Sequence, residues 1–113
     1  MLCDTNILIA HLNGEHTITH ALHKSKRHLY ISAITTIEVL ALPKLTKIEI
    51  STIQDFLLNF VTISVDERLA QDAAVLCRDF KLKVPDSIIA ATAIYLRVPL
   101  VTRDKEFQRV KNL

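Results

Sequence analysis

Glycine is nearly absent from this sequence. Among its 113 residues the one glycine is Gly14. Phosphate-binding loops of the GxxxxGK type and dinucleotide-binding turns of the GxGxxG type both need several glycines, because the backbone must approach the phosphate closely. The sequence therefore excludes both kinds of loop, and any phosphate chemistry must use another device.

Cysteine, aromatic residues and long apolar runs are also scarce. Cys3 and Cys77 are scattered, so they fit neither a disulfide framework nor a CxxC metal knuckle. We expect both to be reduced, buried thiols in a cytoplasmic protein without an export signal. The longest apolar stretch, Ile88 to Leu96, is far shorter than a membrane span, so no membrane association is expected. With aromatics at 5% and no Trp, a surface that stacks bases is not expected.

Apolar residues, by contrast, make up 50% of the chain, and charged residues 23%. This length and apolar content predict a single well-cored domain over residues 1–113. Lys and Arg number 14 against 12 Asp and Glu, a net charge of +2. That balance permits a nucleic-acid partner but does not require one.

Helical and strand-like patterns alternate, which predicts an α/β fold with a parallel sheet between helical layers. The predicted strands are Met1–Cys3, Leu29–Ile31, Val61–Val65 and Leu100–Thr102. Helices are predicted from Thr5 to about Asn13, from Glu15 to about Arg27, around Ile34–Ala41, Ile53–Phe60 and Leu69–Phe80, over Ile88–Leu96, and briefly after Asp104.

Capping signals mark several helix starts. Ser32 is predicted to cap the third helix. Ser64 with Glu67 is the pattern of a capping box for the fifth. The fourth helix has two candidate capping boxes, Thr46 with Glu49 and Ser51 with Gln54, and the pattern does not choose between them.

Four carboxylates occupy unusual places. Asp4 and Asp104 follow predicted strands, and open α/β sheets bind ligands at the carboxyl ends of their strands. Asp86 stands at the mouth of the most apolar helix. Glu38 is predicted to lie on a buried helix face, where an acid is rare unless it is paired or holds a metal. The apolar arc around it is Ile34, Ile37 and Ala41.

Each acid also has a purely structural interpretation: Asp4, Asp86 and Asp104 as helix N-caps, and Glu38 as a rim residue paired with a lysine. One shared cause accounts for all four. Carboxylate oxygens are preferred ligands of hard divalent cations such as Mg²⁺ or Mn²⁺. Such a cation activates water and neutralises the charge that develops on a phosphodiester. Phosphodiester hydrolysis is therefore the predicted reaction class.

These residues belong to four short motifs that together resemble the PIN domain, specifically VapC-like toxins of type II toxin–antitoxin systems. The likeness runs through nearly the whole chain. The motifs are Asp4-Thr5-Asn6, Thr36-Ile37-Glu38, Pro85-Asp86-Ser87-Ile88-Ile89-Ala90-Ala91-Thr92-Ala93 and Leu100-Val101-Thr102-Arg103-Asp104-Lys105-Glu106-Phe107.

The resemblance implies a three-layer α/β/α fold with a central parallel sheet of four to five short strands. It implies a Mg²⁺- or Mn²⁺-dependent endoribonuclease, usually a homodimer, with a small antitoxin covering its active site. Asn6 and Thr102 match positions that support the acids. Related chains continue further, so we expect the C-terminal edge strand to be shortened or missing, with residues 110–113 as its stub. The implied catalytic and metal-ligating residues are Asp4, Glu38, Asp86 and Asp104.

Basic residues near the acids are candidates for contacts with RNA phosphates, although a solvated charged face also explains them. Arg103 and Lys105 flank Asp104, and Lys83 precedes Asp86. Because stacking aromatics are few, recognition of a structured RNA by shape and backbone is favoured. A further basic run comprises Lys24, Lys26, Arg27 and His28.

A zinc site is a weaker candidate. His16, His20 and His23 recur at helical spacing, but no acid or cysteine completes a ligand set, so we interpret them as a solvated face.

Three other functions are alternatives to the nuclease. A receiver-like phosphotransfer domain could use Asp66 as phosphoacceptor, but it needs adjacent acids after its first strand, and here Thr5 and Asn6 follow Asp4. A dehalogenase-type phosphatase needs a second Asp where Asn6 stands. A non-catalytic PIN-fold module that binds RNA or a partner would be indicated by loss of an acid, and all four are present.

Overall fold

The computed structural model describes residues 1–25, 28–111 and 113. The strands are β1 (Leu2–Cys3), β2 (Tyr30–Ser32), β3 (Val61–Ile63) and β4 (Leu100–Val101). The helices are α1 (Thr5–Leu12), α2 (His16–Lys24), α3 (Ala33–Leu40), α4 (Lys47–Leu57), α5 (Glu67–Phe80) and α6 (Val84–Leu96), followed by the 3-10 helix η1 (Lys105–Arg109).

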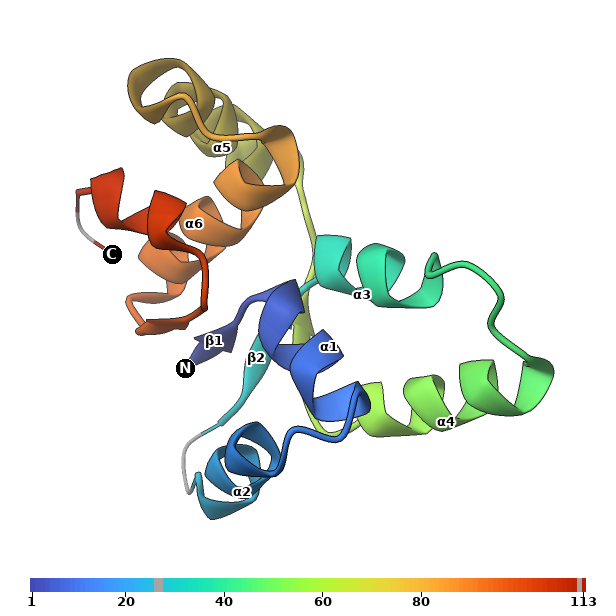
Figure 1. Cartoon of the computed structure of the whole chain (residues 1–113). Helices are drawn as coiled ribbons and strands as arrows, with labels where there is room; N and C mark the ends of the chain where they lie inside the picture. The colour runs from blue at the N-terminus through green and yellow to red at the C-terminus, as the bar shows by residue number, and fades with distance from the viewer. Residues whose placement is uncertain (26–27, 112) are drawn as a thin grey trace.

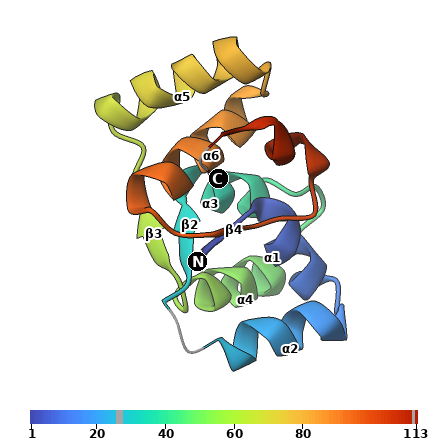
Figure 2. The ribbon, with the colours of Figure 1, turned by 90° about the vertical axis from the view of Figure 1, so that its left-hand side faces the viewer.

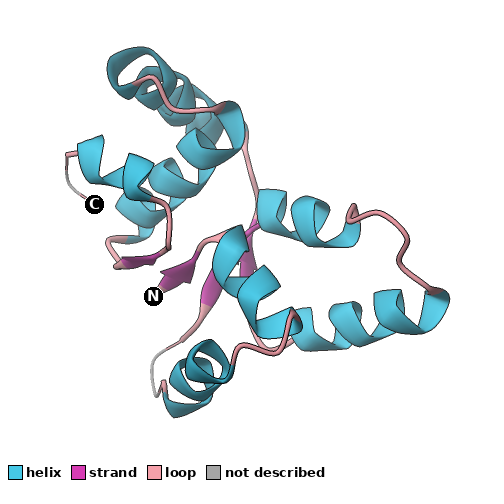
Figure 3. Cartoon of the chain, in the orientation of Figure 1, coloured by secondary structure: helices cyan, strands magenta, loops and turns pink. Residues whose placement is uncertain are grey.

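The strands form one parallel sheet in the order β3-β2-β1-β4, as the alternating pattern predicts. Leu2 is paired with Tyr30 on one side and with Leu100 on the other. Helices lie on both faces (Figures 1 and 3). Because every strand points the same way, the residues that follow β1, β2 and β4 meet at one edge of the sheet.

Two apolar cores cover the two faces of the sheet. Successive side chains of a strand point to opposite faces, so Leu2 packs with α6 and η1 while Cys3 packs with α1, α3 and α4. Figure 2 shows α5 and α6 on one side of the sheet and α1, α2 and α4 on the other. The predicted three-layer arrangement is confirmed.

Helix α6 is the central helix that its apolar sequence predicts. Its buried residues include Ile89 and Ala90 against the sheet and Ala91 against α5. Leu69 and Ala73 of α5 complete that second contact. Covered on both sides, α6 holds the residues of its first turn in a fixed place at the sheet edge.

The predicted buried arc of α3 is wrong for two of its three residues, because Ile37 and Ala41 are exposed and Ile34 is only half-buried. Ile37 is 61% exposed, whereas Thr35 and Val39 are fully buried. Thr35 is hydrogen-bonded to Thr5 of α1 (Oγ1 to Oγ1, 2.9 Å), so a polar contact decides which side of α3 is inside. A search for apolar periodicity does not detect such a contact.

The helix caps are resolved by hydrogen bonds. Ser32 accepts from the backbone N–H of Ile34 at 3.2 Å, as predicted. At α4 the capping box is Thr46 with Glu49, with both hydrogen bonds at 3.1 Å, and Ser51 lies inside the helix. The predicted Ser64–Glu67 box is wrong, because the cap of α5 is Asp66, which accepts from the N–H of Leu69 at 2.8 Å.

The ends of the predicted elements differ slightly from those observed. Helix α2 ends at Lys24, and Lys26 and Arg27, predicted in the same helix, lie outside the described residues. The short last helix is η1, and residues 110, 111 and 113 form no strand. Both cysteines are free, as predicted. Cys3 is buried, which raises its pKa to about 11, whereas Cys77, predicted to be buried, is only half-buried. No helix in the described part of the chain is long and apolar enough to cross a membrane.

Candidate active site

Asp4 directly follows β1, and its two carboxylate oxygens accept hydrogen bonds from different residues. Its backbone N–H donates to the carbonyl of Val101 at 2.9 Å, which extends the pairing of β1 with β4. One carboxylate oxygen, Oδ1, caps α1 by accepting from the N–H of Thr5 at 2.7 Å. The other, Oδ2, accepts from the hydroxyl of Thr102 at 2.6 Å. The N-cap interpretation is thus correct for Asp4. Its second carboxylate oxygen, Oδ2, is not used for capping and lies at the carboxyl ends of the strands.

Thr102 links three of the predicted residues. Its hydroxyl donates to Asp4 and accepts from the backbone N–H of Asp104 at 2.9 Å and from Nδ2 of Asn6 at 3.4 Å. The one proton and both lone pairs of the hydroxyl are therefore engaged. The motif residues Asp4, Asn6, Thr102 and Asp104 form one hydrogen-bonded group.

Glu38 reaches the same edge of the sheet from α3. Its Oε1 accepts from the hydroxyl of Thr5 at 2.7 Å. Because that hydroxyl has a single proton, the contact between Thr5 and Thr35 has Thr35 as its donor. The residue pattern does not single out Thr35. The one signal that could have done so is its place three residues before Glu38, on the same side of the helix.

Asp86 is not the N-cap of its helix, as one interpretation had it. Lys83 is the N-cap of α6, and Asp86 lies in the first turn, half-buried. Burial raises the pKa of Asp86, the negative charges of Asp4, Asp104 and Glu38 raise it further, and the charge of Lys83 lowers it. Asp86 therefore lies within electrostatic range of the other three candidate acids.

The carboxyl group of Asp4, which is only 4% exposed, also has a raised pKa. Burial raises its pKa above the ordinary value, the hydrogen bonds from Thr102 and Thr5 lower it, and the charges of Glu38 and Asp104 raise it. Two neighbouring carboxyl groups with raised pKa values indicate a site whose negative charge is not compensated by the protein itself.

The donor set fits a hard divalent cation, because it offers carboxylate oxygens and no competing thiolate or imidazole. Within the described ranges, however, no three His, Cys, Asp or Glu side chains are close enough together to ligate one ion. Binding therefore requires the carboxylates to turn toward a common point. Hydrogen bonds hold the carboxylates of Asp4, Glu38 and Asp104. None to the carboxylate of Asp86 is found among the described residues, so Asp86 is the acid best able to turn.

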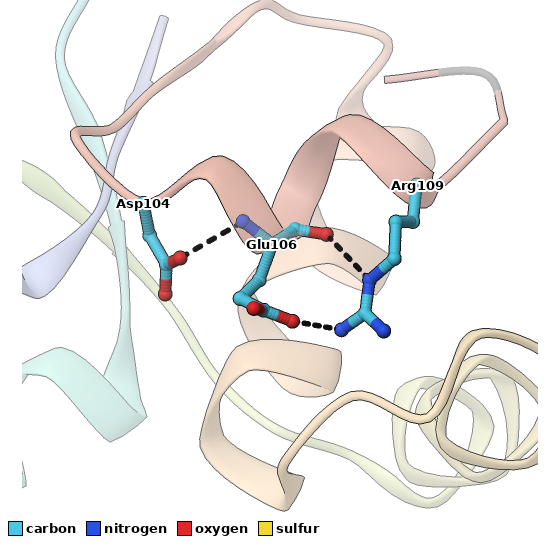
Figure 4. Close-up of polar contacts among 3 residues, drawn as sticks. All are labelled: Asp104, Glu106 and Arg109. Carbon is cyan, nitrogen blue, oxygen red and sulfur yellow. Dashed lines mark hydrogen bonds and ion pairs between the residues drawn. The ribbon is translucent and has the colours of Figure 1, made fainter.

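Asp104 is held by the start of η1. Its Oδ1 accepts from the N–H of Glu106 at 2.9 Å, so it caps this short helix (Figure 4). Glu106 in turn forms an ion pair with Arg109. As with Asp4, one oxygen is used for capping and the other is not.

The basic residues flanking the acids differ in their surroundings. Arg103 forms a two-pronged ion pair with Glu15, at 2.8 Å for each contact. Lys105 and Lys83 are exposed. A cavity of about 240 Å³ lies beside Thr102, Arg103 and Asp104, and a second of about 220 Å³ lies beside Lys83, Asp86 and Asp104.

The histidines of α2 lie apart from this group. His16, His20 and His23 are exposed, and α2 has no buried residue. This exposure is what a solvated helix face requires.

Comparisons with known proteins agree with this architecture. The PIN domain profile matches residues 1–113. A toxin–antitoxin complex from Klebsiella pneumoniae has 34% identity and a TM-score of 0.87, covering 98% of this chain and 92% of that one. VapBC2 from Rickettsia felis, bound to a DNA fragment from its promoter, has 23% identity and a TM-score of 0.85, covering 99% and 93%.

FitAcB from Neisseria gonorrhoeae has 25% identity and a TM-score of 0.76, covering 96% of this chain and 91% of that one. No curated protein sequence matches the chain significantly. The whole-length profile match and the 34% identity over nearly the whole chain confirm the resemblance suggested by the four motifs. The chain belongs to the PIN domain family.

Proposed function

We propose that this protein is a Mg²⁺- or Mn²⁺-dependent endoribonuclease and the toxin of a type II toxin–antitoxin pair. The observation that carries the proposal is that Asp4 and Asp86, at one edge of the sheet, are each within electrostatic range of the other and of Glu38 and Asp104, and that both have raised pKa values. The likeness to solved toxin–antitoxin complexes supports the toxin role and a small antitoxin as partner. We further propose one domain over residues 1–113, a homodimer and a cytoplasmic location.

The four acids are the residues that would hold the ion, which when bound supplies an activated water and neutralises charge on the phosphate. The remaining roles belong to the chain itself. Thr102 holds the carboxylate of Asp4 against the backbone of Asp104. Thr5 holds Glu38. Asp86 is free to rotate toward the other acids, and the exposed Lys83 and Lys105 with Arg103 are the proposed contacts to RNA phosphates.

The receiver-like alternative finds no support in the position of Asp66. That carboxylate caps α5 by accepting from the N–H of Leu69 at 2.8 Å. The charge of Asp66 does not contribute to the pKa shifts of Asp4 and Asp86. A phosphoacceptor would have to share the acidic metal site, so the nuclease is favoured.

Cleavage by the purified protein, freed of antitoxin, tests the proposal. We expect structured RNA to be cut in Mg²⁺ or Mn²⁺ and spared in EDTA. Asp4→Asn and Asp86→Asn should abolish cutting, whereas Asp79→Asn, at an exposed position of α5, should cut like the wild type. Intact RNA with either ion, or full activity of the first two variants, would refute catalysis. In cells, expression without the neighbouring reading frame should arrest growth, and co-expression of that frame should prevent the arrest.

A further inference from the structure

A cavity of about 220 Å³ opens beside Asp86 and Asp104. It is framed by the loop between α5 and α6, the first turn of α6, and η1. Both acidic and basic side chains line this cavity, whereas the candidate metal site consists of the four acids alone. Its lining residues are Lys81, Leu82, Lys83, Asp86, Asp104, Glu106 and Arg109.

One basic residue of the lining, Lys81, is held in a strained backbone conformation. It ends α5 with φ 55° and ψ 37°, in the left-handed region. Glycine is the usual residue at such a helix end, because a Cβ atom makes this conformation costly. A lysine here brings a positive charge to the cavity at the expense of helix-end stability.

The second lysine, Lys83, is the N-cap of α6 and makes no capping hydrogen bond through its side chain. Its charge lowers the pKa of Asp86, so the two groups are within electrostatic range. Neither Lys81 nor Lys83 forms an ion pair with any residue that the structure describes. Both ammonium groups are available to an anion.

The basic residue that η1 contributes to the cavity, Arg109, is already neutralised. Arg109 donates from Nε to the carbonyl of Glu106 at 3.4 Å and forms an ion pair with its carboxylate. Glu106 is held in turn by Asp104, as Figure 4 shows. Among the described residues, the cavity-lining charges without an ion-pair partner are therefore Lys81 and Lys83 and the candidate metal-binding acids Asp86 and Asp104.

We propose that this cavity binds a phosphate of the RNA backbone next to the one that is cut, with Lys81 and Lys83 as its contacts. The inference rests on the proposed nuclease function and adds a direction to it: the RNA strand leaves the acids along the α5–α6 loop. No aromatic ring lines the cavity, so the contact is with the backbone rather than with a stacked base.

The left-handed backbone of Lys81 allows a substitution that removes its charge without destabilising the fold. Lys81→Gly removes the ammonium group and relieves the left-handed backbone, so the variant should be at least as stable to urea as the wild type. Arg97→Gly is the matched control, because Arg97 ends α6 with φ 55° and ψ 45°. It lies 11 residues beyond Asp86 by sequence number, or about 16 Å along the helix.

RNA binding is measured in an Asp86→Asn background, which prevents cleavage, with a structured RNA cut by the wild type. Lys81→Gly and Lys83→Gln should each weaken binding severalfold and reduce the slope of log Kd against log salt by about 0.7 to 0.9, as expected for one lost phosphate contact. Lys83→Arg should retain most of the affinity. Arg97→Gly should leave both the affinity and the slope unchanged.

In the cleavage-competent protein, Lys81→Gly should raise KM and change kcat little. Unchanged binding in Lys81→Gly, or an equal loss in Arg97→Gly, overturns the subsite while leaving the nuclease intact. A wild-type protein that neither binds nor cuts RNA overturns the proposed function and this inference together.

Discussion

The hydroxyl of Thr5 donates to Oε1 of Glu38 across 2.7 Å and so joins the first turn of α1 to the far end of α3. The hydroxyl of Thr35 in turn donates a hydrogen bond to the hydroxyl of Thr5. Thr5 is 7% exposed and Thr35 is fully buried. The position of one candidate metal ligand therefore depends on two hydroxyl groups that are shielded from water.

Thr5→Val should disturb both stability and activity. The substitution keeps the shape of the side chain but leaves the buried hydroxyl of Thr35 without its acceptor, at a cost of about 1 to 3 kcal/mol in the free energy of unfolding. Losing the support of Glu38 should also lower cleavage roughly 10- to 100-fold. Urea unfolding and RNA cleavage measure the two effects.

Thr5→Ser is the matched control, since it retains the hydroxyl and loses only a methyl group. It should keep most of the activity. Equal cleavage by Thr5→Val and the wild type would show that Glu38 does not need this hydrogen bond.

Asp86→Asn should make the metal-free protein more stable. An acid in the first turn of a helix is normally favourable, yet the pKa of Asp86 is raised, first by burial and then by Asp4, Asp104 and Glu38. The fold thus disfavours the ionised carboxylate, and a neutral amide of the same shape removes that penalty. We expect the midpoint of thermal unfolding in EDTA to rise by a few degrees in this variant.

Excess Mg²⁺ or Mn²⁺ should reverse the order, because the ion binds the folded wild type and adds stability by mass action. Thermal unfolding with and without the ion measures both halves of this prediction. A variant that is less stable than the wild type in EDTA would show that the charge of Asp86 stabilises the first turn of α6 more than its burial disfavours it.

The positions of Asp4 and Asp104 could be predicted from chain order alone, because residues at the ends of parallel strands meet at one edge. The burial predicted around Glu38 is only partly correct. The predicted apolar arc includes Ile37, which is 61% exposed, while the fully buried residues of α3 are Val39 and the polar Thr35. Burial of a threonine depends on a partner 30 positions away in sequence, Thr5, and no local pattern reveals that pairing.

Helix caps illustrate the same limit at short range. Both Ser64 and Asp66 precede α5 at plausible distances, and the Ser-x-x-Glu spacing favours Ser64. The strand β3 ends at Ile63 and the helix begins at Glu67, which leaves Asp66 as the capping residue. The ends of neighbouring elements decided the cap, and sequence patterns place those ends least reliably.

Asp66→Ala should therefore destabilise the protein by about 1 kcal/mol, the usual cost of a lost N-cap. Ser64→Ala, the change that a Ser64–Glu67 capping box would make costly, should change the unfolding free energy far less. Urea unfolding of the two variants side by side is sufficient. A larger loss in Ser64→Ala than in Asp66→Ala would contradict the observed cap.

The remaining prediction concerns His11, whose ring stacks on that of Phe56 with a centroid separation of 4.4 Å. Burial lowers the pKa of His11, and the nearby His23 lowers it further. The folded state thus favours the neutral ring, and as pH falls from about 7.5 to about 5.5 the unfolded chain takes up the proton more readily than the folded one. The contribution of His11 is complete at the upper end and declines toward the lower end.

His11→Phe keeps an aromatic ring against Phe56 and cannot be protonated, although it loses the 2.8 Å hydrogen bond to Thr19. The informative quantity for this variant is therefore the pH dependence of its unfolding free energy, and not its stability at the higher pH. We expect the unfolding free energy of the wild type to fall more steeply between these two pH values than that of His11→Phe. His20→Gln, at an exposed position of α2, should follow the wild-type slope. Parallel slopes for the wild type and His11→Phe would mean that His11 is as easily protonated in the folded state as in the unfolded chain.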